Sequence, residues 1–319
     1  MSVGRAWRVA LAALVSLSFL WLLLQDTEVL PTLSSIRSAS PMWMVAGLAA
    51  LAAGYAGRIR RWQLMLRDEN PQLRFLQCGG PLLAGFALNN VLPFRAGDIV
   101  RCVGFGKELG VSSATSTTSL VIERILDALA LLVALGLAMM IFGRSSDQFL
   151  SVSGGLLITI GVLSAALLFF PMPINVLLRG LPSLVARALP RWEAAVDQIV
   201  RRVLSQWNVA THTRTLKALV GWSSMIWVAE GIMFYCVARS LVDVGFAAAA
   251  WLALPMATLA TLLPSTPGHL GTFDFFAAQA MQMGGNSEVA SIAFAVLVHA
   301  TLWIPVTLTG ALWLWIRRT

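Results

Sequence analysis

The chain has 319 residues, of which 58% are hydrophobic and 12% are charged, and its mean hydropathy is +0.77. A soluble domain carries about 25% charged residues, so this composition excludes an ordinary soluble protein. Several apolar stretches are long enough to cross the ~30 Å hydrocarbon core of a bilayer, which takes about 20 residues of helix. We therefore predict an all-α polytopic membrane protein. No polar stretch is long enough to form a soluble catalytic domain, so we expect residues 1–319 to be a single integral membrane domain.

The net charge of +8 would suggest nucleic-acid binding in a soluble protein. In a membrane protein the positive-inside rule explains it, because arginine and lysine gather at the cytoplasmic ends of the spans. We expect membrane lipids, especially anionic ones, as partners and no nucleic acid. The cysteines are isolated and show no paired spacing, which predicts no metal site. No phosphate-binding loop of the GxxxxGK[ST] type is present, and we expect no cofactor.

The N-terminal region predicts two full spans. An apolar run over 9–24 follows two arginines and has no cleavage site after it, so we interpret it as an uncleaved helix. Residues 25–40 are predicted to be a loop, and a second helix covers about 42–57. Arginines cluster over 58–67, which places that end of the second helix, and with it the N-terminus, in the cytoplasm.

An unusually polar break follows over residues 89–101, where asparagine, proline, glycine, aspartate and arginine interrupt the apolar chain. No helix is expected to run through both Pro93 and Gly97, because proline removes an amide donor and glycine relaxes the backbone. At membrane depth such a backbone must be buried in protein or line a wet cavity. Both flanks carry cytoplasmic charges, so we predict a re-entrant hairpin from Phe75 to about Arg101 and not a full span.

The remaining chain predicts four more full spans, giving about six in all. They are expected over about 120–142, 151–170, 218–241 and 288–316. The last of them ends in two arginines, which places the C-terminus in the cytoplasm.

A second break interrupts the apolar residues 246–283. We predict a hairpin here that enters from the outer side of the membrane, and two full spans stay open as an alternative because they give the same sidedness. Counting both hairpins, the structural breaks are predicted at Pro93, Gly97, Pro264, Pro267, Gly268 and Gly271.

The two breaks resemble each other. Leu92-Pro93-x-x-x-Gly97 and Leu263-Pro264-x-x-x-Gly268 share one spacing, and an acid follows each of them. In each half a span precedes the hairpin and another follows it, and sidedness assigns the hairpins to opposite faces. This pattern predicts an inverted-topology repeat, with half-repeats over 42–142 and 218–316, whose broken segments meet at a central substrate site. Pro93 and Pro264 are then expected to approach each other near the membrane midplane.

Charged residues inside the apolar segments are the candidate site, since each costs at least ~2.5 kcal/mol at the bilayer centre when unpaired. Glu123 and Asp127 lie one helical turn apart. Two interpretations stay open for them: an ion pair, to Arg95 or Arg101, that holds the first hairpin, or a head-group or proton site. His299 is interpreted as a packing residue. The candidate substrate-binding residues are Asn90, Arg95, Asp98, Arg101, Glu123, Arg124, Asp127, Glu230 and Asp274.

Three motifs in order, Asn90–Arg101, Glu123–Asp127 and Pro264–Gly271, resemble the flippase-like integral membrane family. That family includes the transmembrane region of lysylphosphatidylglycerol synthetase, the multiple peptide resistance factor. The resemblance implies a protein that translocates or exposes lipids across the cytoplasmic membrane of bacteria and archaea. It also implies that aminoacyl transfer belongs to a separate domain, which we do not expect in this chain.

The resemblance has departures. Asp98 and Asp274 stand where the family commonly has glutamate, and the shorter acids keep the charge but alter its reach. His269 stands where a second glycine is usual, which bears on how closely the backbone approaches at that turn.

Together these features predict a multi-pass protein of the cytoplasmic (inner) membrane of a prokaryote. We expect it to flip or transport an anionic or polyprenyl-type lipid whose head group lies between the two hairpins, without being an enzyme. One alternative is an integral membrane transferase that acts on lipid-linked sugars, and another is a scaffold for a separate lipid-modifying synthase. A partner enzyme of that kind and a homo-oligomer are both compatible with the sequence.

Overall fold

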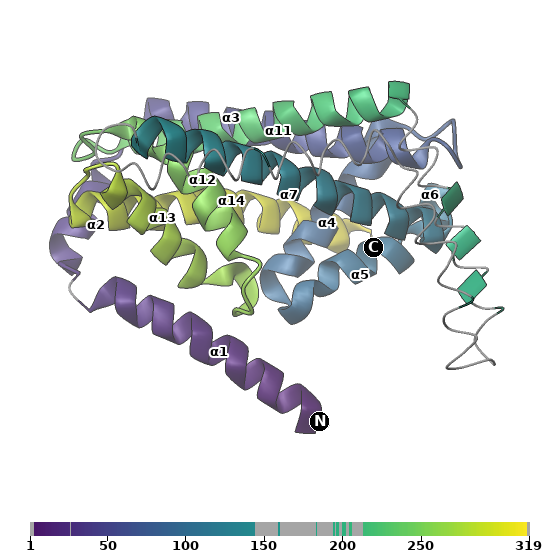
Figure 1. Ribbon diagram of the computed structural model, residues 1–319, viewed down its shortest axis with the longest axis horizontal. Coiled ribbons are helices and arrows are strands. Elements are labelled where there is room, and N and C mark those ends of the chain that lie inside the picture. The colour runs from purple at the N-terminus through teal and green to yellow at the C-terminus, as the bar shows by residue number, and fades with distance from the viewer. Residues whose placement is uncertain are drawn as a thin grey trace.

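The computed structural model describes residues 3–25, 27–143 and 213–317, with a few isolated positions between 159 and 205. These residues form helices and no strands (Figure 1). The long helices are α1 (Val3–Leu24), α3 (Pro41–Leu66), α7 (Ser113–Gly143), α11 (Thr213–Ser240) and α14 (Glu288–Ile316). The shorter elements are α2 (Val29–Arg37), α4 (Phe75–Val91), η1 (Pro93–Arg95), α5 (Ala96–Val103), α6 (Gly106–Leu109), η3 (Ala247–Ala249), α12 (Ala250–Ala260), η4 (Pro267–His269) and α13 (Thr272–Met283).

Helices α3, α7, α11 and α14 are each long and apolar enough to cross a membrane. Helices α1 and α2 meet at an angle of 88° and would form a fifth, broken span if counted together. The prediction of an all-α polytopic membrane protein is confirmed. The span predicted over 151–170 lies outside the described residues, and the count of six spans and the cytoplasmic termini stay predictions.

Three predicted boundaries were wrong. Residues 25–40 contain α2 and are not a loop throughout. Helix α3 continues to Leu66, well past the arginines that were expected to end it, because some of those arginines are paired inside the protein. Helix α7 begins at Ser113, not near residue 120. The Ser112 hydroxyl accepts a hydrogen bond from the Thr115 N–H, 3.2 Å away, which is the usual way a serine caps a helix start.

Helices α3 and α11 pack against each other along their lengths and run in opposite directions. The Ser40 N–H, just before α3, donates to the carbonyl oxygen of Ser240, the last residue of α11, at 2.8 Å. At the other end of the pair, Arg61 donates to the Ser223 hydroxyl at 2.8 Å. The two helices approach closely where α3 presents Gly47, Gly54 and Gly57.

Each predicted break separates the two arms of a helical hairpin. The first hairpin consists of α4, η1 and α5, and the second of α12, η4 and α13. Because α3 and α11 are antiparallel, the hairpins begin at opposite ends of the bundle, and their loops meet (Figure 1). Helices α12 and α13 have 11 and 12 residues, too few for either to span a bilayer, which takes about 20. The structure therefore favours a hairpin over two full spans in the second half.

The helix contacts keep their pattern when the two halves are exchanged. Helix α4 packs on α14 and α12 packs on α7, so each hairpin lies against the long helix that follows the other hairpin. Helices α3 and α11 hold corresponding places in the two halves, so their contact with each other is unchanged by the exchange. This is the arrangement expected of an inverted repeat; the division into half-repeats 42–142 and 218–316 stays a prediction.

The backbone conformations of the two breaks match, but in a different register from the one that the sequence spacing predicted. Pro93 and Pro267 each begin a short 3-10 turn, and in each turn the third residue, Arg95 or His269, is left-handed, with φ of 52° and 59°. These are the only non-glycine residues with positive φ in the described part of the chain. Pro93 therefore corresponds to Pro267, three residues after the Pro264 that the Leu-Pro spacing indicated.

Gly97 was wrongly predicted to be part of the break. It lies inside α5, and the chain bends before it, at Leu92 and Arg95. Leu92 is extended because the residue before a proline avoids helical backbone angles. Gly97 is needed for close packing instead, because a Cβ there would lie 2.0 Å from the Gly85 carbonyl oxygen on the facing arm of the hairpin.

The contact between α4 and α14 depends on Gly310. A Cβ at this position would lie 2.4 Å from the Leu83 carbonyl oxygen and 2.6 Å from the Ala87 Cβ. We expect Gly310→Ala to destabilise the protein by about 1–3 kcal/mol, the usual cost of overpacking. Thermal unfolding in detergent, followed by tryptophan fluorescence, measures the change.

Gly221→Ala is the matched control, since no heavy atom lies within 4 Å of a Cβ built there. This exposed position on α11 should gain up to about 1 kcal/mol from the better helix propensity of alanine. Equal effects of the two substitutions would contradict the tight α4–α14 contact.

Candidate functional site

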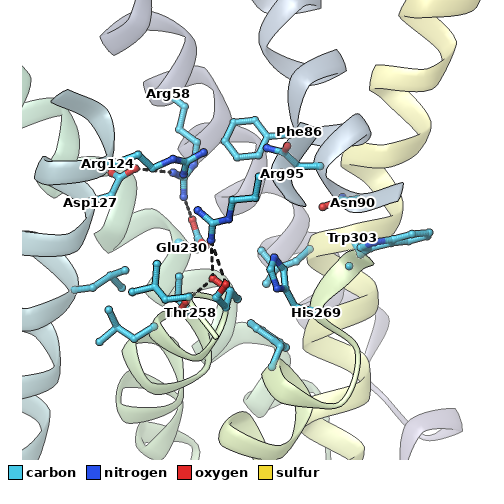
Figure 2. Close-up of a pocket in the computed structure, with 18 of the residues that line it drawn as sticks. Arg58, Phe86, Asn90, Arg95, Arg124, Asp127, Glu230, Thr258, His269 and Trp303 are labelled. Carbon is cyan, nitrogen blue, oxygen red and sulfur yellow. Dashed lines mark hydrogen bonds and ion pairs between the residues drawn. The ribbon is translucent and has the colours of Figure 1, made fainter. Parts of the chain in front are cut away.

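A cavity of about 260 Å³ lies where the two hairpins meet (Figure 2). Helices α3, α7, α11 and α14 also contribute to its walls. A second cavity of about 310 Å³ adjoins it, and Ala12 of α1, Pro93 and Pro264 are among its lining residues. The two prolines thus line one cavity, as expected if they approach each other, and their position near the membrane midplane stays a prediction. The residues common to both cavities are Asn89, Arg95, Thr261, Leu262, Gly268 and His269.

Arg95 occupies the junction of the two cavities. Figure 2 shows its side chain directed into the pocket, with Glu230 on one side and His269 on the other. It donates to the Thr261 carbonyl at 3.3 Å and to the Thr261 hydroxyl at 3.1 Å. No carboxylate in the described part of the chain forms an ion pair with it. Arg95 is therefore a half-buried cation that is held only by neutral acceptors.

A buried network of charged residues forms the wall of the first cavity opposite Arg95. Arg58, on α3, donates to Glu230 of α11 and lies 3.9 Å from Asp127 of α7. Arg61 binds Asp127 through two hydrogen bonds, of 2.7 and 3.1 Å. The Trp227 indole N–H donates to Asp127 at 3.1 Å. Since each charge has an opposite charge in contact, the network can be buried, and it ties three membrane-spanning helices together.

Aromatic rings surround the Arg58 guanidinium. Its carbon lies 5.0 Å from the centre of the Trp227 ring, 5.7 Å from that of Tyr55 and 5.9 Å from that of Phe86. Rings at these distances attract a cation through their negative faces. Arg58 is therefore fixed by its carboxylates and its aromatic neighbours together.

Two further ion pairs hold the first hairpin against α7. Arg101 donates to Glu123, and both are almost fully buried, with 2% and 4% of their surface exposed. Arg124 donates to Asp98 at 2.7 Å. Asp98 also accepts from the Asn89 side-chain amide at 2.9 Å, which links the two arms of the hairpin. The structure thus favours the ion-pair interpretation for Glu123, with Arg101 as its partner.

The second hairpin is held by a histidine–aspartate pair. The His299 Nδ1 lies 2.6 Å from Asp274 Oδ1, and its Nε2 lies 2.9 Å from the Gly268 carbonyl oxygen. The other oxygen of Asp274 accepts from the Gly271 N–H at 2.9 Å. Both positive-φ glycines of the break are therefore bound to this pair. His299 also lines the first cavity, and its interpretation as a packing residue stays a prediction.

The structure divides the predicted substrate-binding residues into two groups. Five of them line the first cavity: Asn90, Arg95, Arg124, Asp127 and Glu230. The others lie behind its wall: Asp98, Arg101, Glu123 and Asp274. Asp98 and Asp274 still contact it indirectly, because each binds a residue that lines it. The Arg101–Glu123 pair does not reach either cavity.

Sequence reasoning missed Arg58 and Arg61 as members of the site, because it took them for cytoplasmic charges beyond the end of a span. Both are buried, at 8% and 1% exposure. A charge count could have found them. The predicted intramembrane carboxylates of the first hairpin, α7 and α11 outnumber the arginines predicted beside them, so at least one more cation was needed nearby.

Comparison with known proteins identifies the family. The model of the lysylphosphatidylglycerol synthase TM region matches residues 9–310, nearly the whole chain. A comparison with curated protein sequences gave no match. The match includes both hairpins, the buried charge network and the helices that line the cavities. The chain therefore belongs to the lysylphosphatidylglycerol synthase TM region family, and is a multi-pass membrane protein of a family connected with lipid modification or transport.

Proposed function

We propose that the protein translocates an anionic or polyprenyl-type lipid across the cytoplasmic membrane of a prokaryote, with the head group in the cavity between the two hairpins. The observation that carries this proposal is the position of Arg95. It lies at the junction of the two cavities, and it has no carboxylate partner among the described residues. A phosphate would form charge-assisted hydrogen bonds with it, which are about twice as strong as bonds between neutral groups.

The charge balance of the cavity supports an anionic ligand. The arginines at and behind its wall are Arg58, Arg61, Arg95 and Arg124, and the carboxylates bound to them are Asp98, Asp127 and Glu230. Four cations thus face these three anions, and Asp274, behind the same wall, is bound to His299. When the Asp274–His299 pair has no net charge, one positive charge is left, that of Arg95, and a lipid phosphate would neutralise it. Each of these carboxylates is bound to an arginine or to His299, so none of them is free to bind an ammonium group.

The shape of the two cavities supports a lipid over a small soluble anion. The first is lined by five charged side chains as well as by aromatic and aliphatic ones, whereas Arg95 is the only charged side chain among the described residues that line the second. An amphipathic molecule fits this pair, with its head group in the first cavity and its chains along the second. Anionic phospholipids and polyprenyl phosphates both have this form.

We also propose that the chain is not itself an enzyme. An integral membrane transferase would need a free acid or base beside the bound substrate, whereas Asp98 and Glu123 each bind an arginine and Asp274 binds His299. A separate lipid-modifying enzyme as partner and a homo-oligomeric assembly remain compatible with this proposal. Turnover of a lipid-linked sugar by the purified protein would contradict it.

The test is lipid movement in vesicles that contain the purified protein and fluorescent phosphatidylglycerol. We expect the protein to accelerate movement between leaflets over empty vesicles, and Arg95→Gln to reduce the rate about tenfold or more, as expected for loss of ~1.5–3 kcal/mol from a hydrogen bond to a charged group. Arg37→Gln is the control, because Arg37 is exposed at the end of α2. No acceleration with any lipid of a broad panel would overturn the proposed function.

A further inference from the structure

The environment of His299 determines how many protons the Asp274–His299 pair holds. Both ring nitrogens of His299 face oxygens that accept hydrogen bonds: Asp274 Oδ1 at 2.6 Å and the Gly268 carbonyl at 2.9 Å. A backbone carbonyl oxygen cannot donate, so Nε2 must carry a hydrogen. The short contact between Nδ1 and the carboxylate needs a second hydrogen, on Nδ1 or on Asp274. The pair therefore holds one proton more than a neutral histidine beside an ionised aspartate, and its net charge is zero.

Loss of that proton breaks one of the two hydrogen bonds. A neutral imidazole has a single N–H, which can bind Asp274 or Gly268 but not both. If it stays with the carboxylate, the Nε2 lone pair faces the Gly268 carbonyl oxygen at close range. Both residues are largely buried, at 6% and 9% exposure, and the Gly268 carbonyl loses its hydrogen-bond donor from the protein. The Gly268 turn is then released.

The Gly268 turn belongs to the site itself. Gly268 is left-handed, with φ of 74°, and lines both cavities together with Arg95 and His269. A Cβ at Gly268 would lie 3.4 Å from the Asn90 carbonyl oxygen, so the turn of the second hairpin rests against the first hairpin. Proton loss at His299 thus acts on the place where the two loops meet.

Apart from Arg95, the other titratable and charged groups around this cavity are already paired or neutral. On α13, Asp274 is the partner itself, and on η4, His269 is hydrogen-bonded to the Ser265 hydroxyl at 2.8 Å. The remaining charges that line the cavity are Arg58, Arg95, Arg124, Asp127 and Glu230. When the Asp274–His299 pair is protonated, the charged residues around the cavity keep the excess positive charge of Arg95. When the pair is deprotonated, the negative charge of Asp274 cancels that positive charge.

We propose that Asp274 and His299 form a proton-binding site whose occupancy is linked to binding of the anionic lipid. The protonated pair keeps the second hairpin closed on a cavity with one positive charge, and this state binds the anion more tightly. The proton is taken up from water on one side of the membrane and released on the other when the hairpin opens. This inference rests on the proposed function and adds the proton as a second transported species.

Asp274→Asn reproduces the protonated state without a titratable carboxyl group. The asparagine Nδ2 would donate to His299 Nδ1, its Oδ1 would accept from the Gly271 N–H, and His299 would keep its bond to Gly268. All the present hydrogen bonds are retained, so this variant is expected to fold. Asp243→Asn is the matched control, because Asp243 is exposed in the turn after α11.

The first measurement is the affinity of the purified full chain in detergent for fluorescent phosphatidylglycerol, at about pH 6 and about pH 9, on either side of the ordinary histidine range. We expect the wild type and Asp243→Asn to bind about fivefold or more tightly at the lower pH, the usual size of coupling between two sites. Asp274→Asn should bind fluorescent phosphatidylglycerol equally well at both pH values.

The second measurement is lipid movement in vesicles under a pH gradient. The wild type should distribute the fluorescent lipid unequally between leaflets, and Asp274→Asn should move it without responding to the gradient. A wild-type affinity that is the same at both pH values, or a pH dependence that survives in Asp274→Asn, would overturn the proton site. If no lipid moves in any protein, the proposed function fails, and the binding measurement still decides whether the proton site exists.

Discussion

Asp127→Ala is expected to destabilise the protein by about 3–5 kcal/mol, the usual effect of removing one partner from a buried ion pair. Asp127 accepts hydrogen bonds from Arg61 and from the Trp227 indole, and it lies near Arg58. Without it, Arg61 keeps only the Ser223 hydroxyl as a partner, although it is 1% exposed. The free energy of unfolding in mixed micelles, from denaturant titration followed by tryptophan fluorescence, measures the loss.

Asp197→Asn provides the control for this prediction. Asp197 forms an ion pair of 2.7 Å with Arg201, but the Arg201 side chain is 77% exposed. Exposed pairs contribute about 0–1 kcal/mol, so this substitution should hardly change the unfolding free energy. If Asp127→Ala were as mild as Asp197→Asn, the buried network would not be what holds α3, α7 and α11 together.

Arg101→Met is expected to have an effect of similar size for the same reason, with an anion and not a cation left unpaired. It leaves Glu123 buried without its cation, at about 3–5 kcal/mol. The double variant Arg101→Met/Glu123→Met should recover most of this loss, because two packed apolar side chains need no partner. A double-mutant cycle on the unfolding free energy gives the coupling between the two sites.

The double variant also separates stability from transport. Neither Arg101 nor Glu123 lines a cavity, so a folded double variant should move lipid at close to the wild-type rate. This outcome would assign the pair to holding the first hairpin against α7. A stable double variant with no lipid movement would show instead that this pair takes part in transport.

The breaks were predictable because proline and glycine act locally. Pro93 and the Pro267–Gly271 segment interrupt their helices as the sequence indicated. The register between the breaks was not predictable from spacing alone. Two alignments with the same Pro-x-x-x-Gly pattern were available in the second half, from Pro264 and from Pro267. Only the left-handed backbone at Arg95 and His269 decides between them, and an arginine in this conformation leaves no sequence signal.

The buried charges were predictable as candidates but not as pairs. The intramembrane position of Glu123 and Glu230 already marked them as residues that need partners. Their partners depend on which helices lie side by side, and the antiparallel contact between α3 and α11 spans a long sequence separation. The sequence alone therefore does not distinguish Arg58 and Arg61 from ordinary cytoplasmic charges.

The pairing of Arg58 and Arg61 has a consequence for how the chain enters the membrane. Helix α3 is synthesised before α7 and α11, which carry the carboxylates that these arginines bind. Both arginines lie within about three turns of the end of α3, near enough for their long side chains to reach the head-group region while unpaired. We infer that they move into the protein only when Asp127 and then Glu230 are inserted, so that biogenesis of the first half is completed by the insertion of the second.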